Sequence, residues 1–210
     1  MKIAILMQGL IGPNLTEFKK NIDAVRTIFS NHETDLYVFT YKYEGLNAVD
    51  YGIDYLIETT NCSDDELHPI IQRMTCTRND RSKINNLKEV RSIMVLLDMI
   101  RVLDKKYDYV CRTRTDQYHQ IDNIDDWFIP NTYVIPNVHC YNEFNDQFGI
   151  ADMETMRHVW YYESIDEYIK LYSSAYNIEN CLHIGCQQKG IPVVKKNVNQ
   201  SILHPDRLHQ

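Results

Sequence analysis

The order of apolar and polar residues along the chain predicts alternating strands and helices. An apolar run at residues 3–7 has the pattern of a strand buried on both faces. Residues 15–29 repeat apolar side chains at helical spacing, and Asn14, with Glu17 three positions later, predicts an N-cap with a capping box. A second apolar run follows at residues 36–40. This opening therefore predicts one strand–helix–strand unit, the start of a nucleotide-binding α/β sheet.

The same patterns predict further elements along the rest of the chain. Strands are expected at residues 53–57, 107–111, 133–136, 148–151 and 192–194, and helices at 65–74, 82–103 and 153–189, the last with breaks near Ser164 and Asn177. The tail that follows is polar and predicts a loop. No repeat, low-complexity segment or linker interrupts the pattern. We therefore expect one α/β domain over residues 1–210, with a mixed, mainly parallel sheet flanked by helices.

Composition and charge narrow the class of protein. The chain is 44% hydrophobic and 24% charged, which is ordinary for a globular domain. A formal net charge of -7 without a basic face argues against a nucleic-acid partner. The six cysteines do not form a zinc-binding pattern, and no apolar run has the length of a signal peptide or a membrane span. We expect a protein without a membrane span, located in the cytoplasm.

The tract at residues 107–116, Tyr-Asp-Tyr-Val-Cys-Arg-Thr-Arg-Thr-Asp, carries the strongest chemical signal. Its strand pattern leads directly into two arginines and a carboxylate. Ligands of open α/β sheets bind beyond the carboxyl ends of the strands. Arg114 offers a planar set of donors for an anion, and Asp116 offers oxygen ligands for a hard divalent cation. The tract therefore predicts a phosphate-and-metal site, with a surface Arg–Asp pair as the alternative.

The loop after the first strand predicts a second part of this site. Its sequence, Gln-Gly-Leu-Ile-Gly, lacks the G-x-G-x-x-G pattern and the P-loop lysine, so neither a Rossmann dinucleotide site nor an ATPase is indicated. Gly9 allows a ligand to approach the backbone and Gln8 can contact a ribose or base edge, although a plain tight turn explains both. We expect the nucleoside to lie over the ends of the first two strands, against Gln8, Gly9, Thr40 and Tyr41.

Three further segments hold candidate site residues. Arg81, Asn85 and Lys88 share one face of the long helix, where they would clamp a diphosphate or form a solvated surface. Asp146 precedes a predicted strand and is a candidate to accept a proton from an attacking hydroxyl or to stabilise a cationic sugar ring, with an Asx-turn as the alternative. His204, in the tail, is a candidate metal ligand.

Together, these segments and the later Asn-Asp-Gln-Phe-Gly-Ile-Ala of residues 145–151 resemble GT-A glycosyltransferases. The tract up to residue 116 is similar to that of WavE-like lipopolysaccharide glycosyltransferases, and nearly the whole chain resembles chlorella-virus glycosyltransferase domains that act on the major capsid protein. The resemblance implies hexosyl or deoxyhexosyl transfer from a UDP-sugar to a glycan or glycoprotein acceptor, with Mn²⁺ or Mg²⁺ on Asp116 and His204. It also implies a nucleotide-binding part near residues 1–116 and an acceptor part near 117–210.

One departure from this family keeps other functions open. The D-x-D motif of the family corresponds to Arg114-Thr115-Asp116, so its first aspartate is replaced by an arginine. Arg114 would then help to neutralise the leaving diphosphate. The missing aspartate is the best argument for a catalytically silent nucleotide-sugar or glycan-binding module. A nucleotidyltransferase is the other alternative, although the basic glycine-rich loop that it needs is absent. Asp146 as a general base would make the transferase inverting, and a retaining enzyme needs no such base.

Overall fold

A computed structural model of the chain describes residues 1–11, 14–60, 64–76, 79–138, 140, 144–175, 177–198 and 200–203. Its strands are β1 (Lys2–Gln8), β2 (Glu33–Tyr41), β3 (Tyr55–Thr59), β4 (Tyr109–Arg114), β5 (Gln117–Gln120), β6 (Tyr133–Pro136), β7 (Gly149–Ala151), β8 (Val193–Lys196) and β9 (Gln200–Leu203). Its helices are α1 (Leu15–Ile28), α2 (Asp64–Ile71), α3 (Asp80–Val102), α4 (Met153–Trp160), α5 (Ile165–Ser173) and α6 (Ile178–Gln188), with a 3₁₀ helix, η1, at Ile124–Trp127.

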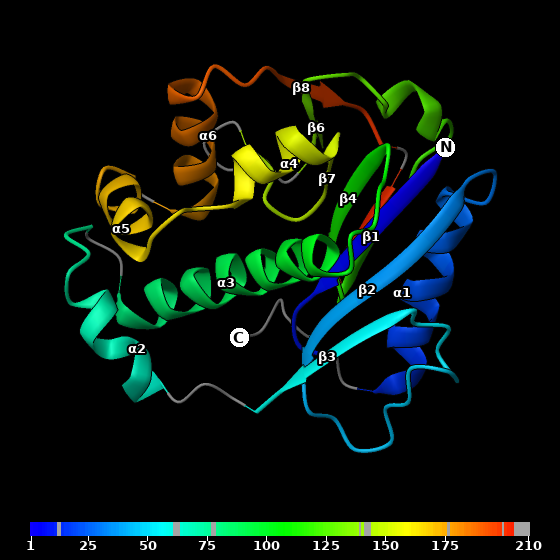
Figure 1. Cartoon of the computed structure of the whole chain (residues 1–210), viewed down its shortest axis with the longest axis horizontal. Helices are drawn as coiled ribbons and strands as arrows, with labels where there is room; N and C mark the ends of the chain where they lie inside the picture. The colour runs from blue at the N-terminus through cyan, green and yellow to red at the C-terminus, as the bar shows by residue number, and fades with distance from the viewer. Residues whose placement is uncertain are drawn as a thin grey trace.

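Seven of these strands form one sheet in the order β3-β2-β1-β4-β7-β6-β8 (Figure 1). The first four strands of this order run parallel to one another, and β7 is antiparallel to both of its neighbours, β4 and β6. The edge strand β8 pairs in parallel with β6. The sheet is thus mixed and mainly parallel. The predicted fold class, a single α/β domain, is confirmed.

Helices cover both faces of the sheet. Successive side chains of a strand point to opposite faces, so neighbouring residues of β1 pack into different cores. Ala4 and Leu6 of β1 pack into the core shared with α3, α4, α5 and α6. Ile3 and Ile5 pack into the second core, which contains the apolar face of α1. All four side chains are fully buried. This explains why β1 is continuously apolar: a central strand covered on both sides has no solvent face.

Local signals fixed several boundaries as the sequence predicts. The side-chain oxygen of Asn14 accepts a hydrogen bond from the Glu17 amide, 2.9 Å away, and so caps α1. Ser164 and Asn177, the predicted breaks in the C-terminal helical region, are the N-caps of α5 and α6. The predicted third strand is two residues early, because β3 begins at Tyr55.

Two predictions about the C-terminal half and the central strand are wrong in extent. β4 does not end at residue 111 but continues to Arg114, so both arginines of the tract belong to the strand. Part of the tail is also not a loop: β9 pairs with β5 as a separate two-stranded antiparallel sheet. Among the described helices, none is both long and apolar enough to cross a membrane.

Candidate functional site

Arg112 lies in the core instead of at the strand exit. It alternates with Val110 along β4 and therefore faces α3, where it forms an ion pair with the carboxylate of Glu89. Its side chain has no exposed surface, and its guanidinium lies 4.8 Å from the centre of the Trp160 ring. The Nε and Nη1 atoms of Arg112 are buried without a hydrogen-bond partner in the described part of the chain. Arg112 therefore carries unused donors.

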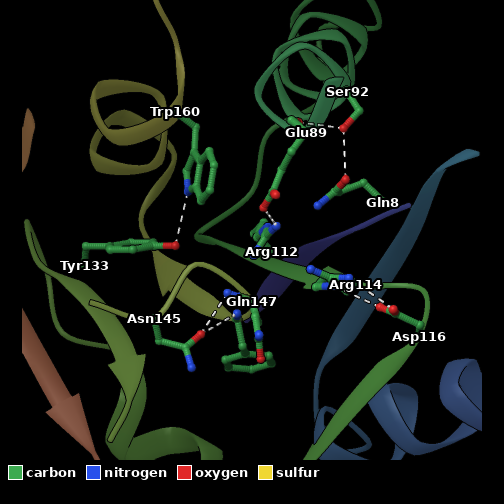
Figure 2. Close-up of polar contacts among 11 residues, drawn as sticks. Gln8, Glu89, Ser92, Arg112, Arg114, Asp116, Tyr133, Asn145, Gln147 and Trp160 are labelled. Atoms are coloured by element: carbon green, nitrogen blue, oxygen red, sulfur yellow. Dashed lines mark hydrogen bonds and ion pairs between the residues drawn. The ribbon is translucent and has the colours of Figure 1, made fainter. Parts of the chain in front are cut away.

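Arg114 and Asp116 form a two-pronged ion pair at the carboxyl end of β4. Arg114 Nε donates to Asp116 Oδ1 over 2.9 Å, and Arg114 Nη2 donates to Asp116 Oδ2 over 3.1 Å (Figure 2). Burial lowers the pKa of Arg114, but the hydrogen bonds and charge of Asp116 more than offset it, so the pKa is raised overall. Asp116 is only 5% exposed. The structure thus contains the Arg–Asp pair of the alternative prediction, with Asp116 buried and Arg114 partly exposed.

The backbone between these two residues is tied to the exit of β1. The Thr115 amide donates to the Gln8 carbonyl at 3.1 Å, and the Thr115 hydroxyl donates to the Leu10 carbonyl at 2.5 Å. Asn21 of α1 donates from its side-chain amide to the Thr115 carbonyl at 2.8 Å. Gly9 has a φ of +132°, and a Cβ at this position would lie 2.9 Å from Thr115 Oγ1. The β1 exit and the Arg–Thr–Asp turn therefore form one close-packed unit that requires glycine.

Helix α3 contributes the buried Ser92 and the half-buried Glu89 to the same edge of the sheet. The Ser92 hydroxyl lies 3.0 Å from the Gln8 side-chain oxygen, to which it can donate, and 2.7 Å from the Glu89 carbonyl. Burial raises the pKa of Glu89; Arg112 opposes this, Asp146 raises the pKa further and Arg114 lowers it. The Glu89 carboxylate therefore lies close enough to Arg112, Arg114 and Asp146 to interact electrostatically with all three.

Asp146 precedes β7 in a tightly bonded loop. The side-chain oxygen of Asn145 accepts hydrogen bonds from the amides of Gln147 and Phe148, at 2.8 and 3.1 Å, so the Asx-turn alternative applies to Asn145 (Figure 2). Asp146 is 5% exposed, and its Oδ1 has no hydrogen-bond partner among the residues that the structure describes. The same holds for Gln147 Oε1. The turn therefore presents buried acceptors without partners.

We call Glu89, Arg112, Arg114, Asp116 and Asp146 the strand-end cluster. Its members come from α3, β4, the turn after β4 and the loop before β7. It combines a fixed guanidinium, suited to an anion, with buried donors and acceptors that are unpaired in the described structure. Such groups are costly to bury unless a ligand or water pairs with them. The arrangement suits a ligand that has both an anionic group and hydroxyl groups.

The other predicted nucleotide contacts lie at the same edge or along α3. The Gly9 amide donates to the Phe39 carbonyl at 3.2 Å, which places Gln8 and Gly9 beside the end of β2, where Thr40 and Tyr41 follow. Thr40 is buried and Tyr41 is half-buried. Arg81 and Asn85 are exposed on the N-terminal half of α3, and Lys88 is half-buried. Their spacing places them on the stripe that continues to Glu89 and Ser92. All these contacts stay predictions.

The residues around Asp116 do not fit a divalent-cation site. Both Asp116 oxygens accept hydrogen bonds from Arg114, and the Glu89 carboxylate is paired with Arg112. Within the described residues, no three His, Cys, Asp or Glu side chains are grouped to share a metal ion. His204 lies outside these residues. Binding of Mn²⁺ or Mg²⁺ stays a prediction from the sequence, and no step of the reaction proposed below uses a metal ion.

Glu89, Ser92 and Arg112 were not predicted as site residues from the sequence. The alternation of β4 held a signal for Arg112, because Val110, Arg112 and Arg114 share one face of a strand. Glu89 and Ser92 are one helical turn apart on α3. They give no local signal, since their partners lie 23 and 84 residues away.

Comparison with known proteins shows which fold the chain shares but does not show its activity. The profile of the family described as "Domain of unknown function (DUF7796)" matches residues 86–207, and no curated protein matches the chain. A Drosophila β-1,4-galactosyltransferase 7 mutant, solved with manganese, UDP-Gal and xylobiose, matches 99% of this chain and 72% of its own, with 11% identity and a TM-score of 0.51. Mouse xyloside xylosyltransferase 1, in its apo form, matches 92% of this chain and 85% of its own, with 12% identity and a TM-score of 0.48. The Drosophila match shows a shared GT-A-like fold.

Proposed function

The chain belongs to the family described as a domain of unknown function (DUF7796), and we propose from its site that it is a glycosyltransferase. It would take a sugar from a nucleotide-diphosphate donor, UDP-linked, and pass it to a hydroxyl group of a glycan or glycoprotein. Hexosyl or deoxyhexosyl transfer, and a viral capsid protein as acceptor, stay predictions that rest on the sequence resemblance. The GT-A-like fold is compatible with this activity but does not by itself establish it.

The observation that carries the proposal is the composition of the strand-end cluster. A nucleotide sugar has a diphosphate, which needs a cation, and a ring of hydroxyl groups, which both donate and accept hydrogen bonds. The cluster offers the Arg114 guanidinium for the first. For the second it offers Asp146 and, next to it in the same turn, Gln147, whose acceptor atoms Oδ1 and Oε1 have no hydrogen-bond partner in the described structure. These groups lie at the carboxyl edge of the sheet, where α/β proteins bind nucleotides.

The proposed reaction uses Arg114 and Asp146 in separate roles. The bond between sugar C1 and the diphosphate oxygen breaks, and its electron pair stays on the diphosphate, where Arg114 stabilises the charge. The acceptor oxygen bonds to C1 and loses its proton to Asp146, whose Oδ1 has no partner in the described structure. Attack from the face opposite the leaving group gives inversion.

A second candidate is a binding module that holds a nucleotide sugar without turning it over. The observation in its favour is Arg114 itself, which stands where the GT-A resemblance has an aspartate and pairs with both oxygens of Asp116. A nucleotidyltransferase is a weaker alternative, because its glycine-rich basic loop is absent from the β1 exit.

Nucleotide release from a panel of sugar donors separates these candidates. The purified chain is incubated with UDP-, GDP-, CDP- and dTDP-sugars, and free nucleoside diphosphate and product masses are followed over time. Steady UDP release that exceeds that of an Asp146→Asn variant supports the transferase. Asp98→Asn, which changes an α3 carboxylate paired with Arg101, is the control and should match wild type. Binding without release indicates a module, and pyrophosphate release from a nucleoside triphosphate indicates a nucleotidyltransferase.

A further inference from the structure

We propose that the site binds the donor diphosphate without a divalent cation, because Arg114, fixed by Asp116, supplies the positive charge. The inference rests on the proposed function and concerns how the donor is held. It differs from the metal-dependent binding that the sequence resemblance implies. Three features of the site support it.

The first feature is that both carboxylate oxygens of Asp116 already accept hydrogen bonds. Asp116 is the one acidic residue retained from the D-x-D pattern, and both of its oxygens are used by Arg114. A metal ion on Asp116 would have to displace these two hydrogen bonds and would then lie against the guanidinium. Like charges at such short range repel each other strongly in a buried site. Asp116 is therefore placed as a partner of Arg114 and not as a metal ligand.

The second feature is the donor capacity that remains on Arg114. A guanidinium has five N–H groups, and Asp116 takes one from Nε and one from Nη2. Arg114 keeps partial exposure, at 21% of its side chain, whereas Asp116 behind it keeps 4%. Its remaining donors are thus accessible from solvent at the strand end. Arginine with free planar donors binds phosphate oxygens well.

The third feature is the rigid frame that fixes this cation. Thr115, between the two residues, bonds to Gln8, to Leu10 and to Asn21 through three separate groups. Arg114 also pairs in strand register with Gln8. Gly9 removes the side chain that would otherwise stand between the β1 exit and Thr115. A cation held in this way is preorganised, so little ordering is needed when the diphosphate binds.

Calorimetric titration with UDP tests the inference. Wild type is titrated in EDTA and in Mn²⁺, together with Arg114→Gln, Arg114→Lys and Arg114→Asp. We expect the wild-type affinity to agree within about threefold between the two conditions, since no cation is required. Arg114→Gln should weaken binding about tenfold or more in both conditions, because a charged hydrogen bond is lost. Arg114→Asp recreates two acidic residues and should bind UDP only with Mn²⁺.

Controls separate a local loss from misfolding. Arg101→Gln removes an exposed arginine at the end of α3 and should leave UDP affinity unchanged. Melting curves check each variant, and the wild-type comparison of EDTA with Mn²⁺ stands even where Arg114→Gln does not fold. Wild-type binding that requires Mn²⁺ would overturn the inference and leave the proposed glycosyl transfer intact. No binding of UDP under either condition would overturn both.

Discussion

Asp146 is the residue on which the proposed chemistry depends most. It is buried, its Oδ1 has no partner in the described structure, and it adds to the charge around Glu89. A neighbouring residue, Asn145, takes the structural role of holding the turn through two backbone amides. Asp146 is thus not required for the hydrogen bonds of the turn, and the proposed function gives its carboxylate the role of accepting the proton of a substrate hydroxyl.

The change Asp146→Asn therefore tests the base directly. We expect sugar transfer to fall by about two orders of magnitude, because the amide cannot accept the proton, with UDP affinity nearly unchanged. Steady-state rates and calorimetry measure the two quantities separately. A parallel loss of UDP affinity would make Asp146 a donor-site or structural residue. Full activity in the Asn variant would favour a retaining reaction without an enzymic base.

Gly9 has a distinct role at the residue scale, because both its conformation and its surroundings exclude a side chain. We expect Gly9→Ala to lower the free energy of unfolding by about 1–3 kcal/mol and to weaken UDP binding. Gly52→Ala is the matched control: it also has a positive φ, but nothing lies within 4 Å of its Cβ position. Its cost should be about 1 kcal/mol, with UDP affinity unchanged. Equal urea midpoint shifts for the two variants would show that the contact with Thr115 carries no energy.

At the scale of elements, β4, β6, β7 and α4 build the frame that keeps Arg112 buried. Gly149 of β7 is the register partner of Arg112, and its lack of a side chain makes room for the Tyr133 ring. The Tyr133 hydroxyl accepts a hydrogen bond from Trp160 Nε1 at 3.1 Å, and Trp160 packs on the Arg112 guanidinium. These elements thus hold the Tyr133 and Trp160 rings in place around the buried Arg112 guanidinium.

The close packing around Gly149 predicts that adding a single methyl group there strongly destabilises the fold. A Cβ on residue 149 would lie 2.1 Å from the Tyr133 hydroxyl oxygen, in a fully buried region, so Tyr133 must move. We expect Gly149→Ala to destabilise the fold by about 3 kcal/mol. Tyr133→Phe, which removes only the hydroxyl, should cost about 1 kcal/mol. Urea unfolding of both variants measures this, and a smaller loss for Gly149→Ala than for Tyr133→Phe would contradict the proposed packing.

Elements with local signals could be predicted from the sequence, and those that depend on distant partners could not. The apolar run of β1, the cap at Asn14 and the helix breaks near Ser164 and Asn177 have local signals, and they were predicted correctly. The extension of β4 was missed because it contains Arg112, a charge that is tolerated in the core through Glu89 of α3. The β5–β9 pair joins segments about 80 residues apart, which no short-range pattern reveals.

The same distinction applies to the candidate site. Gln8, Gly9, Arg114 and Asp116 were chosen because strand ends gather at one edge of a sheet, and the structure brings them together there. The pairing of Arg114 with Asp116 was only the alternative prediction, because a carboxylate two residues after an arginine has the same sequence whether it binds a metal ion or the arginine. The structure adds the geometry of the pair, in which both Asp116 oxygens accept hydrogen bonds from Arg114.

At the scale of the whole molecule, two separate regions bring basic side chains together on a protein of formal net charge -7. One is the strand-end cluster, in which Arg112 and Arg114 are paired with Glu89 and Asp116. The other is a cavity at the C-terminal end of α3, lined by residues that include Arg101, Lys105, Lys106 and Arg157. It leads into the start of β4, whereas the cluster lies at the end of that strand. We assign the donor to the cluster, because the Arg114 guanidinium, unpaired polar atoms and the strand ends lie together there.

A crystal structure of the chain with UDP tests this assignment most directly. We predict that the diphosphate lies within about 3 Å of the Arg114 guanidinium, with Asp116 still paired to Arg114 and the uridine over the ends of β1 and β2. Diphosphate bound in the cavity beside Arg101 and Arg157, or at any place out of reach of Arg114, would contradict it.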